Sequence, residues 1–307
     1  MQYQTFLTQL QFQLADCFKK HAKISFFSVP KNNGTSLDAF CITPEGKSIS
    51  PTLYVQDYYR KYQSGESMQH ILDEIYALFV DYQSLELPPF HQYGDFSYAK
   101  SHIAYKLVHT EMNRKLLSQI PHLPFLDLSI VFFLHLERKG QLPMTSLIYH
   151  RHLEAWNCSL EELWKLASEN TPRLFPPTIG RLDAILNELL KSQSPSFSLL
   201  LPMRTPIYIL SNCLSLYGAC CILYPNILHT FANSLNRNLI LIPSSIHEFL
   251  LLPEEEALPL SELNDMVNSV NHSSVLLEER LSDHVYYYSK EKRQLTIPSL
   301  SDSAFSP

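Results

Sequence analysis

Two pairs of β-rich runs near the C-terminus are separated by too few residues to hold a helix. The runs at 238–242 and 245–252 are joined by a very short turn, and so are those at 283–288 and 293–297. A parallel pair of strands needs a crossover of about a dozen residues or more, whereas antiparallel strands can be joined by a tight turn. The spacing therefore predicts an α+β fold with a mixed, mostly antiparallel sheet and helices packed on it, in two lobes.

The first part of the chain has the pattern of helix, hairpin and helix. Apolar residues recur at helical spacing over 2–21 and again over 67–81. Two β-rich runs between these helices flank Asn32-Asn33-Gly34. Asn-Gly favours a hairpin, because such a turn needs positive φ at both central residues. We therefore expect an N-terminal α/β lobe at residues 1–93.

The stretch "SLELPPFHQYGDFS" has two prolines and a glycine, which is typical of a linker. After it we expect a main α+β domain at 98–297 and a disordered tail at 298–307. A Pro/Ser-rich segment at 191–206 is an alternative boundary. Ser159 and Glu162 form a capping box, so a helix should begin there. Further strands are expected at 101–109, 128–136, 145–150, 206–211 and 217–223, and further helices at 178–191, 226–235 and 260–271.

Composition and charge narrow the classes of function. The 307-residue chain is 45% apolar and 18% charged, as in globular proteins that fold without a partner. A net charge of −6 and a pI of about 6.1 argue against nucleic-acid binding, which usually shows a basic excess. The apolar stretches are shorter than a spanning helix, and the first lysines follow the apolar positions, unlike a signal peptide. We expect a cytoplasmic protein with reduced cysteines and no membrane partner.

The motifs predict neither a cofactor nor a metal ion. The chain has seven glycines, and the segment that ends like a phosphate-binding loop, "CITPEGKS", has Cys41 where that loop needs glycine. The H-E-x-x-H and C-x-x-C patterns of zinc sites do not occur. His150 and His152 would share one face of a strand, but the spacing names no third ligand.

The segment "LILIPSSIHEFLLLP" contains the candidate residues for catalysis. If 245–252 is a strand, Ser245 and His247 lie on the same face, about 6.6 Å apart along the chain. The serine hydroxyl could then approach the imidazole. Glu248 would point to the opposite face, and no nucleophile elbow (G-x-S-x-G) surrounds the serines. The alternatives are a structural strand with one polar edge, and a histidine that binds a ligand or partner.

Two functions from different classes stay open. The first is a non-catalytic binding or regulatory module with an unknown protein or small-molecule partner. Tyrosine-rich runs favour it, because tyrosine buries a large area and keeps a hydrogen-bonding tip. Packing within the fold is the alternative role of these tyrosines. The candidate binding residues are Tyr58, Tyr59, Tyr286 and His284.

The second function is a hydrolase that uses His247 as the base. Ser245 or Ser244 would be the nucleophile, and folding would bring Asp283 and His284 close to it. Sequence spacing does not give the distances on which this hypothesis depends.

Nine segments in order resemble an uncharacterised family, domain of unknown function 5688, which is common in anaerobic gut Gram-positive bacteria. The resemblance covers about residues 25–290 and implies a bacterial protein, with no established activity. It also implies small residues at Cys220 and Cys221, which argues against a cysteine-based site. The segments are "VPKNNGTSLDAF", "ISPTLYVQDYY", "IAYKLVHTEMN", "IPHLPFLDLSIVF", "ENTPRLFPP", "YILSN", "ILYPNILHTFA", "LIPSSIHEFLLLP" and "LSDHVYYY".

Overall fold

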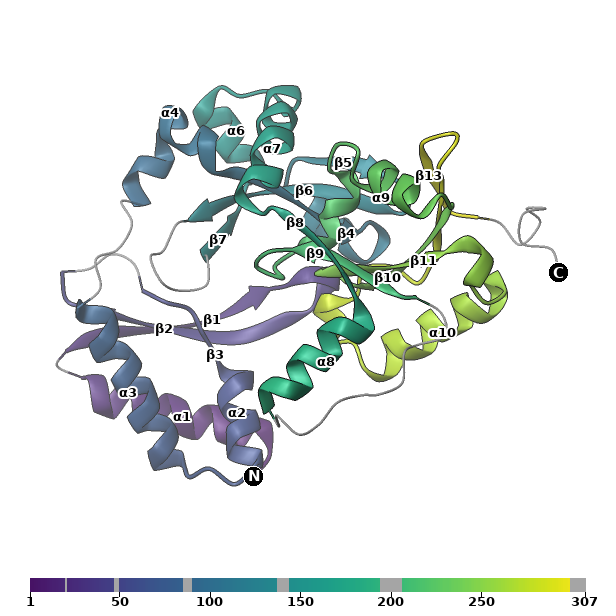
Figure 1. Ribbon diagram of the computed structural model, residues 1–307. Coiled ribbons are helices and arrows are strands. Elements are labelled where there is room, and N and C mark those ends of the chain that lie inside the picture. The colour runs from purple at the N-terminus through teal and green to yellow at the C-terminus, as the bar shows by residue number, and fades with distance from the viewer. Residues whose placement is uncertain (20, 47–49, 85–89, 137–143, 194–205, 299–307) are drawn as a thin grey trace. The chain divides into compact units, whose positions relative to one another are not determined.

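The computed structural model describes residues 1–19, 21–46, 50–84, 90–136, 144–193 and 206–298. The chain divides into two compact units, Met1–Leu87 and Pro88–Pro307. This division falls a few residues before the predicted boundary, and the predicted tail lies outside the described residues from 299 onward. The described strands form antiparallel sheets of three, six and four strands, which confirms the α+β class (Figure 1).

In the first unit, three helices pack against a three-stranded sheet (Figure 1). Asn33 and Gly34 have φ of 58° and 69° in the turn between the first two strands, as the Asn-Gly pattern predicts. The helical repeat of Phe6, Leu10 and Leu14 is fully buried in the core of this unit. The elements are α1 (Tyr3–Phe18), β1 (Ala22–Pro30), η1 (Asn32–Gly34), β2 (Ser36–Pro44), β3 (Leu53–Tyr54), α2 (Val55–Gln63) and α3 (Met68–Ser84).

The four-stranded sheet of the second unit is built around β6 (Leu128–Leu136), an almost wholly buried strand. One side of β6 pairs with β4 (Ile103–His109), and the other side pairs with β5 (His122–Phe125) and then β7 (Met144–Leu147). A continuous apolar run is typical of such a central strand.

The six-stranded sheet has the order β13-β12-β10-β11-β9-β8. Its central pair buries Leu239, Ile240, Leu241, Phe249 and Leu251 completely. The strands are β8 (Pro177–Arg181), β9 (Tyr208–Asn212), β10 (Leu239–Ser245), β11 (Glu248–Pro253), β12 (Tyr286–Ser289) and β13 (Gln294–Thr296).

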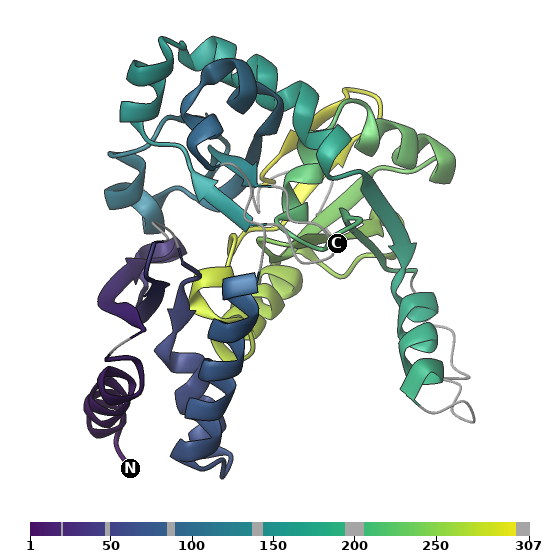
Figure 2. The ribbon, with the colours of Figure 1, turned by 90° about the vertical axis from the view of Figure 1, so that its left-hand side faces the viewer.

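Helices of the second unit cover these sheets, and α8 continues from the end of β8 (Figure 2). No helix in the described part of the chain has the length and apolarity needed to cross a membrane. The helices are η2 (Phe90–Gly94), α4 (Phe96–Ala99), η3 (Lys100–His102), η4 (Glu111–Asn113), α5 (Arg114–Leu117), α6 (His150–Trp156), α7 (Leu160–Leu174), α8 (Leu182–Gln193), η5 (Gly218–Leu223), α9 (Ile227–Leu235), η6 (Glu254–Glu256), α10 (Leu260–Ser273) and η7 (Leu277–Glu279).

Helix α7 lies along the outer edge of β4. The hydroxyl oxygen of Thr171 accepts a hydrogen bond from the backbone N–H of Tyr105 at 3.1 Å. The side-chain amide of Asn170 donates to the carbonyl of Ile103 at 3.0 Å. The helix begins after its N-cap, Ser159, whose hydroxyl accepts the N–H of Glu162, one of the two hydrogen bonds of the predicted capping box.

Four local predictions are wrong, in addition to the continuous strand predicted at 245–252, which a turn at His247 interrupts. The predicted strand at 217–223 is the short helix η5, and the predicted helix at 178–191 begins as strand β8. The predicted strand at 145–150 ends at 147, and part of the predicted linker is helical. The prediction at 217–223 failed because the apolar run "LYGACCIL" fits a buried strand as well as a buried helix, and hydrophobic periodicity does not distinguish them. Tyr217 has a left-handed φ of 55°, which turns the chain out of an extended path.

Candidate functional site

His247 lies in a two-residue turn between β10 and β11, rather than inside a strand at 245–252 as predicted. The turn gives Ser245 and His247 different partners. The Ser245 hydroxyl oxygen accepts the backbone N–H of His247 at 3.0 Å. The imidazole Nδ1 accepts the backbone N–H of Tyr217 at 3.1 Å. The Ser245 hydroxyl and the His247 ring therefore both bind backbone N–H groups and stabilise the turn and the neighbouring loop.

Ser244 and Asp283, the other candidates for catalysis, also form hydrogen bonds within the local fold. The Ser244 hydroxyl donates to Glu248 Oε1 at 3.0 Å. Asp283 Oδ1 accepts a hydrogen bond from the side-chain amide of Asn271 at 2.7 Å. In these contacts, neither serine hydroxyl faces a histidine ring nitrogen.

The ring of His247 is enclosed by groups from three other segments. The Tyr217 ring stacks on it at 5.9 Å between centroids with an interplanar angle of 10°, and Glu279 Oε1 lies 4.0 Å from Nε2. Lys106 Nζ lies 4.0 Å from the centroid of the Tyr217 ring. Burial lowers the pKa of His247, against the opposing effect of Glu279.

A second polar cluster forms around Asp127, at the turn between β5 and β6. Its carboxylate accepts hydrogen bonds from the Ser282 hydroxyl at 2.6 Å, from His284 Nδ1 at 3.1 Å and from the Tyr286 hydroxyl at 2.6 Å. The preceding residue, Leu126, has a left-handed φ of 54°, a conformation that only a constrained turn maintains. The fold thus brings two predicted binding residues, His284 and Tyr286, to the same carboxylate. That carboxylate, Asp127, was not among the residues predicted from the sequence.

The three tyrosines and the histidine that were predicted to bind a partner are not equally accessible. Tyr286 is fully buried, and its burial, with the charge of Asp127, raises its pKa. The side chain of His284 is 55% exposed. In the first unit, Tyr58 is buried against Phe40, and the Tyr59 hydroxyl donates to the carbonyl of Met1. These contacts give both residues of α2 packing roles.

Within the described residues, no group of three His, Cys, Asp or Glu side chains could hold a metal ion. His150 and His152 lie in the first turn of α6 rather than on a strand, and His152 Nδ1 accepts the N–H of Tyr149 at 3.0 Å. Cys220 and Cys221 are free thiols buried in the core, and burial raises the pKa of Cys220. A buried thiol of this kind is a poor nucleophile.

A groove of about 370 Å³ opens beside α9 and the β12–β13 hairpin, which lie side by side in Figure 1. Its lining combines aromatic and aliphatic side chains with one arginine and one histidine, and none of the lining residues is acidic. Sequence reasoning missed this groove, because its parts are far apart in the chain. The lining residues are Phe125, Ile222, Leu223, Tyr224, Pro225, Asn226, Ile227, Leu228, His229, Tyr288, Arg293 and Leu295.

The Arg293 guanidinium and Nδ1 of the His229 ring have no hydrogen-bond or ion-pair partner among the described residues. Arg293 is exposed and makes no ion pair with any described residue. His229 Nε2 lies 2.9 Å from the side-chain amide nitrogen of Asn233, while its Nδ1 is buried and has no hydrogen-bond partner among the described residues. Arg293 lowers the pKa of Tyr288, although burial raises it more. The charge of the groove is therefore positive in a chain of net charge −6.

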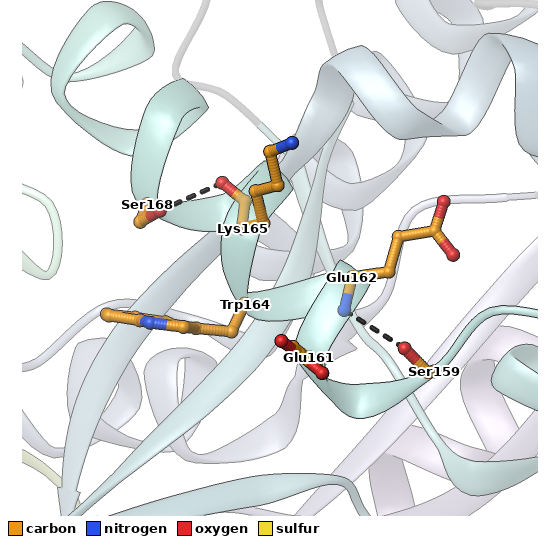
Figure 3. A pocket seen from close by; sticks show the side chains of 6 residues that line it. All are labelled: Ser159, Glu161, Glu162, Trp164, Lys165 and Ser168. Carbon is orange, nitrogen blue, oxygen red and sulfur yellow. Dashed lines mark hydrogen bonds between the residues drawn. The ribbon is translucent and has the colours of Figure 1, made fainter.

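A more open hollow of about 590 Å³ lies over α7 (Figure 3). Its lining side chains all come from this helix and the residue before it, and they diverge: Trp164 points to one side and Glu162 to the other. The Ser159 and Ser168 hydroxyls bind backbone groups of α7 itself. The hollow therefore lacks convergent polar groups, which a specific binding site requires.

The sequence model of a family of unknown function (DUF5688) matches residues 3–290. The chain belongs to this family. No curated protein and no solved structure matches it. The matched range of this DUF5688 chain includes His247, the Asp127 cluster and most of the groove, but it ends before Arg293 and Leu295.

Proposed function

We propose that this DUF5688 chain is a non-catalytic binding module that holds a small amphipathic ligand with an anionic group in the groove beside α9. The carrying observation is the combination of an aromatic and aliphatic lining with Arg293 and without any acidic side chain. Ligand sites in proteins are mostly apolar, with a few polar groups that fix the orientation of the ligand. An unpaired guanidinium beside aromatic rings suits a carboxylate, sulfonate or phosphate attached to an apolar body.

The hydrolase hypothesis gains no support from the contacts around His247. A serine hydrolase needs the serine hydroxyl within hydrogen-bond reach of the base. Here the Ser245 hydroxyl accepts a backbone N–H, and the His247 ring accepts another. The binding function therefore accounts better for the polar groups that the fold leaves without partners.

The groove predicts binding of an amphipathic aromatic sulfonate such as 8-anilinonaphthalene-1-sulfonate. Replacement of Arg293 by glutamine should weaken its affinity about tenfold or more, because a charge-assisted hydrogen bond contributes roughly 1.5–3 kcal/mol. Fluorescence titration of the full chain measures the change.

Lys292 provides the matched control, because it lies in the same hairpin turn and does not line the groove. Lys292→Gln should leave the affinity within about twofold of the original, since it removes the same net charge without a groove contact. Equal losses in the two variants would show that the dye senses net charge alone and would remove the support for the groove.

A further inference from the structure

The loop at 213–217 is held in an unfavourable backbone conformation. Ser215 and Tyr217 have φ of 50° and 55°, in the left-handed region that residues other than glycine rarely adopt. Such conformations persist only where surrounding contacts hold them. This loop leads directly into η5, which begins at Gly218.

Side chains from outside the loop supply those contacts. Asn212 Oδ1 accepts the N–H groups of Leu214 and Leu216 at 3.1 and 3.2 Å, and its amide donates to the carbonyl of Leu216 at 2.7 Å. The N–H of Tyr217 is bound by His247 Nδ1 instead. The last strained residue of the loop therefore depends on an imidazole lone pair.

An imidazole accepts a hydrogen bond at Nδ1 only when that nitrogen carries no proton. The neutral ring then has its proton on Nε2, the nitrogen that faces Glu279 at 4.0 Å. Protonation of His247 would place an N–H group against the N–H of Tyr217. The hydrogen bond would be lost and replaced by a repulsive contact.

The groups around the ring have opposing effects. Glu279 on η7, a backbone hydrogen bond with Ser215 of the loop and Glu248 on β11 favour the protonated form, whereas Lys106 on β4 opposes it across the Tyr217 ring. Burial has the largest effect and lowers the pKa of His247 below its usual value. The neutral ring therefore stabilises the fold above about pH 6.5, and this stabilisation is lost as the pH falls below that value.

We propose that His247 is a pH-responsive latch, which holds Tyr217 at the entrance of η5 when neutral and releases residues 213–217 when protonated. The end of η5, with Ile222 and Leu223, lines the groove. Release of the loop at low pH therefore weakens ligand binding in the groove. This last consequence rests on the proposed function, whereas the latch does not.

Hydrogen exchange of the Tyr217 amide tests the latch without any ligand. Protection, corrected for the intrinsic exchange rate, should fall about tenfold between roughly pH 7.5 and pH 4.5, well below the usual histidine pKa, because one hydrogen bond is lost. His247→Asn should abolish this pH dependence, since the Asn oxygen can accept the same N–H and does not titrate. His272→Asn, at an exposed position on α10, should retain the full dependence.

Equal protection of the Tyr217 amide at both pH values would overturn the latch, and so would an unchanged response in His247→Asn. If that variant does not fold, the ring nitrogens of the unmodified chain give a second test. Their ¹⁵N shifts should place the proton on Nε2 at neutral pH, and a proton on Nδ1 would overturn the proposal. Because these measurements use no ligand, a failure of dye binding affects only the proposed function.

Discussion

Replacement of Gly218 by alanine is expected to lower the free energy of unfolding of the second unit by about 3 kcal/mol or more. A Cβ at this position would lie 2.3 Å from Ser211 Oγ, 2.5 Å from the carbonyl oxygen of His247 and 2.8 Å from the backbone nitrogen of Asn212. The added methyl group would also break the 2.8 Å hydrogen bond from Ser211 Oγ to His247. Denaturant unfolding, followed by tyrosine and tryptophan fluorescence, measures the loss.

Gly94 is the matched control for this prediction, because a Cβ there meets nothing within 4 Å. Gly94→Ala should change the free energy of unfolding by about 0.5 kcal/mol or less. Addition of Ser211→Ala to Gly218→Ala should restore only part of the loss, since the two backbone atoms remain in place. A Gly218→Ala variant as stable as the original chain would show that the turn at His247 moves freely.

Replacement of Asp127 by alanine is the second large expected effect, at about 3 kcal/mol of unfolding free energy. The change leaves the hydroxyl of Tyr286, on a fully buried side chain, without its 2.6 Å partner and also frees Ser282 and His284. A buried polar group without a partner costs more than the hydrogen bond itself contributed. Thermal or denaturant unfolding measures the difference.

A double variant tests whether the loss of stability comes from the hydroxyl that the missing carboxylate leaves without a partner. Asp127→Ala with Tyr286→Phe should regain about 1–2 kcal/mol, because the orphaned hydroxyl is removed. Asp265→Ala, at an exposed position on α10, should be nearly neutral. If the two variants at Asp127 and Tyr286 were simply additive, the carboxylate and the phenol would not be coupled.

Much of the fold could be predicted from local patterns. The prediction for β6 at 128–136 matches the strand exactly, because a long apolar run and flanking turn residues agree there. The helices predicted at 226–235 and 260–271 also match α9 and α10 closely, since amphipathic spacing is a strong signal. The prediction failed at η5, where the left-handed backbone of Tyr217 depends on contacts from remote residues.

The candidate sites were harder to predict than the elements. Asp127 and Tyr286 are 159 residues apart, and no spacing rule connects them. The only local signal was the short "FLDL" turn before β6, which requires a left-handed residue. His247 was singled out from its sequence neighbours, but its ring contacts Tyr217, which is 30 residues away. Local patterns therefore identify polar residues, whereas the fold selects their partners.

The position of α7 along β4 has a consequence for behaviour at high concentration. Open strand edges offer unpaired N–H and C=O groups, on which another chain can add a strand and start aggregation. On β4, the side chain of Asn170 binds the carbonyl of Ile103, and that of Thr171 binds the N–H of Tyr105. The helix thus closes this edge of the four-stranded sheet to intermolecular β-pairing, and these two polar side chains protect the protein from self-association at that edge.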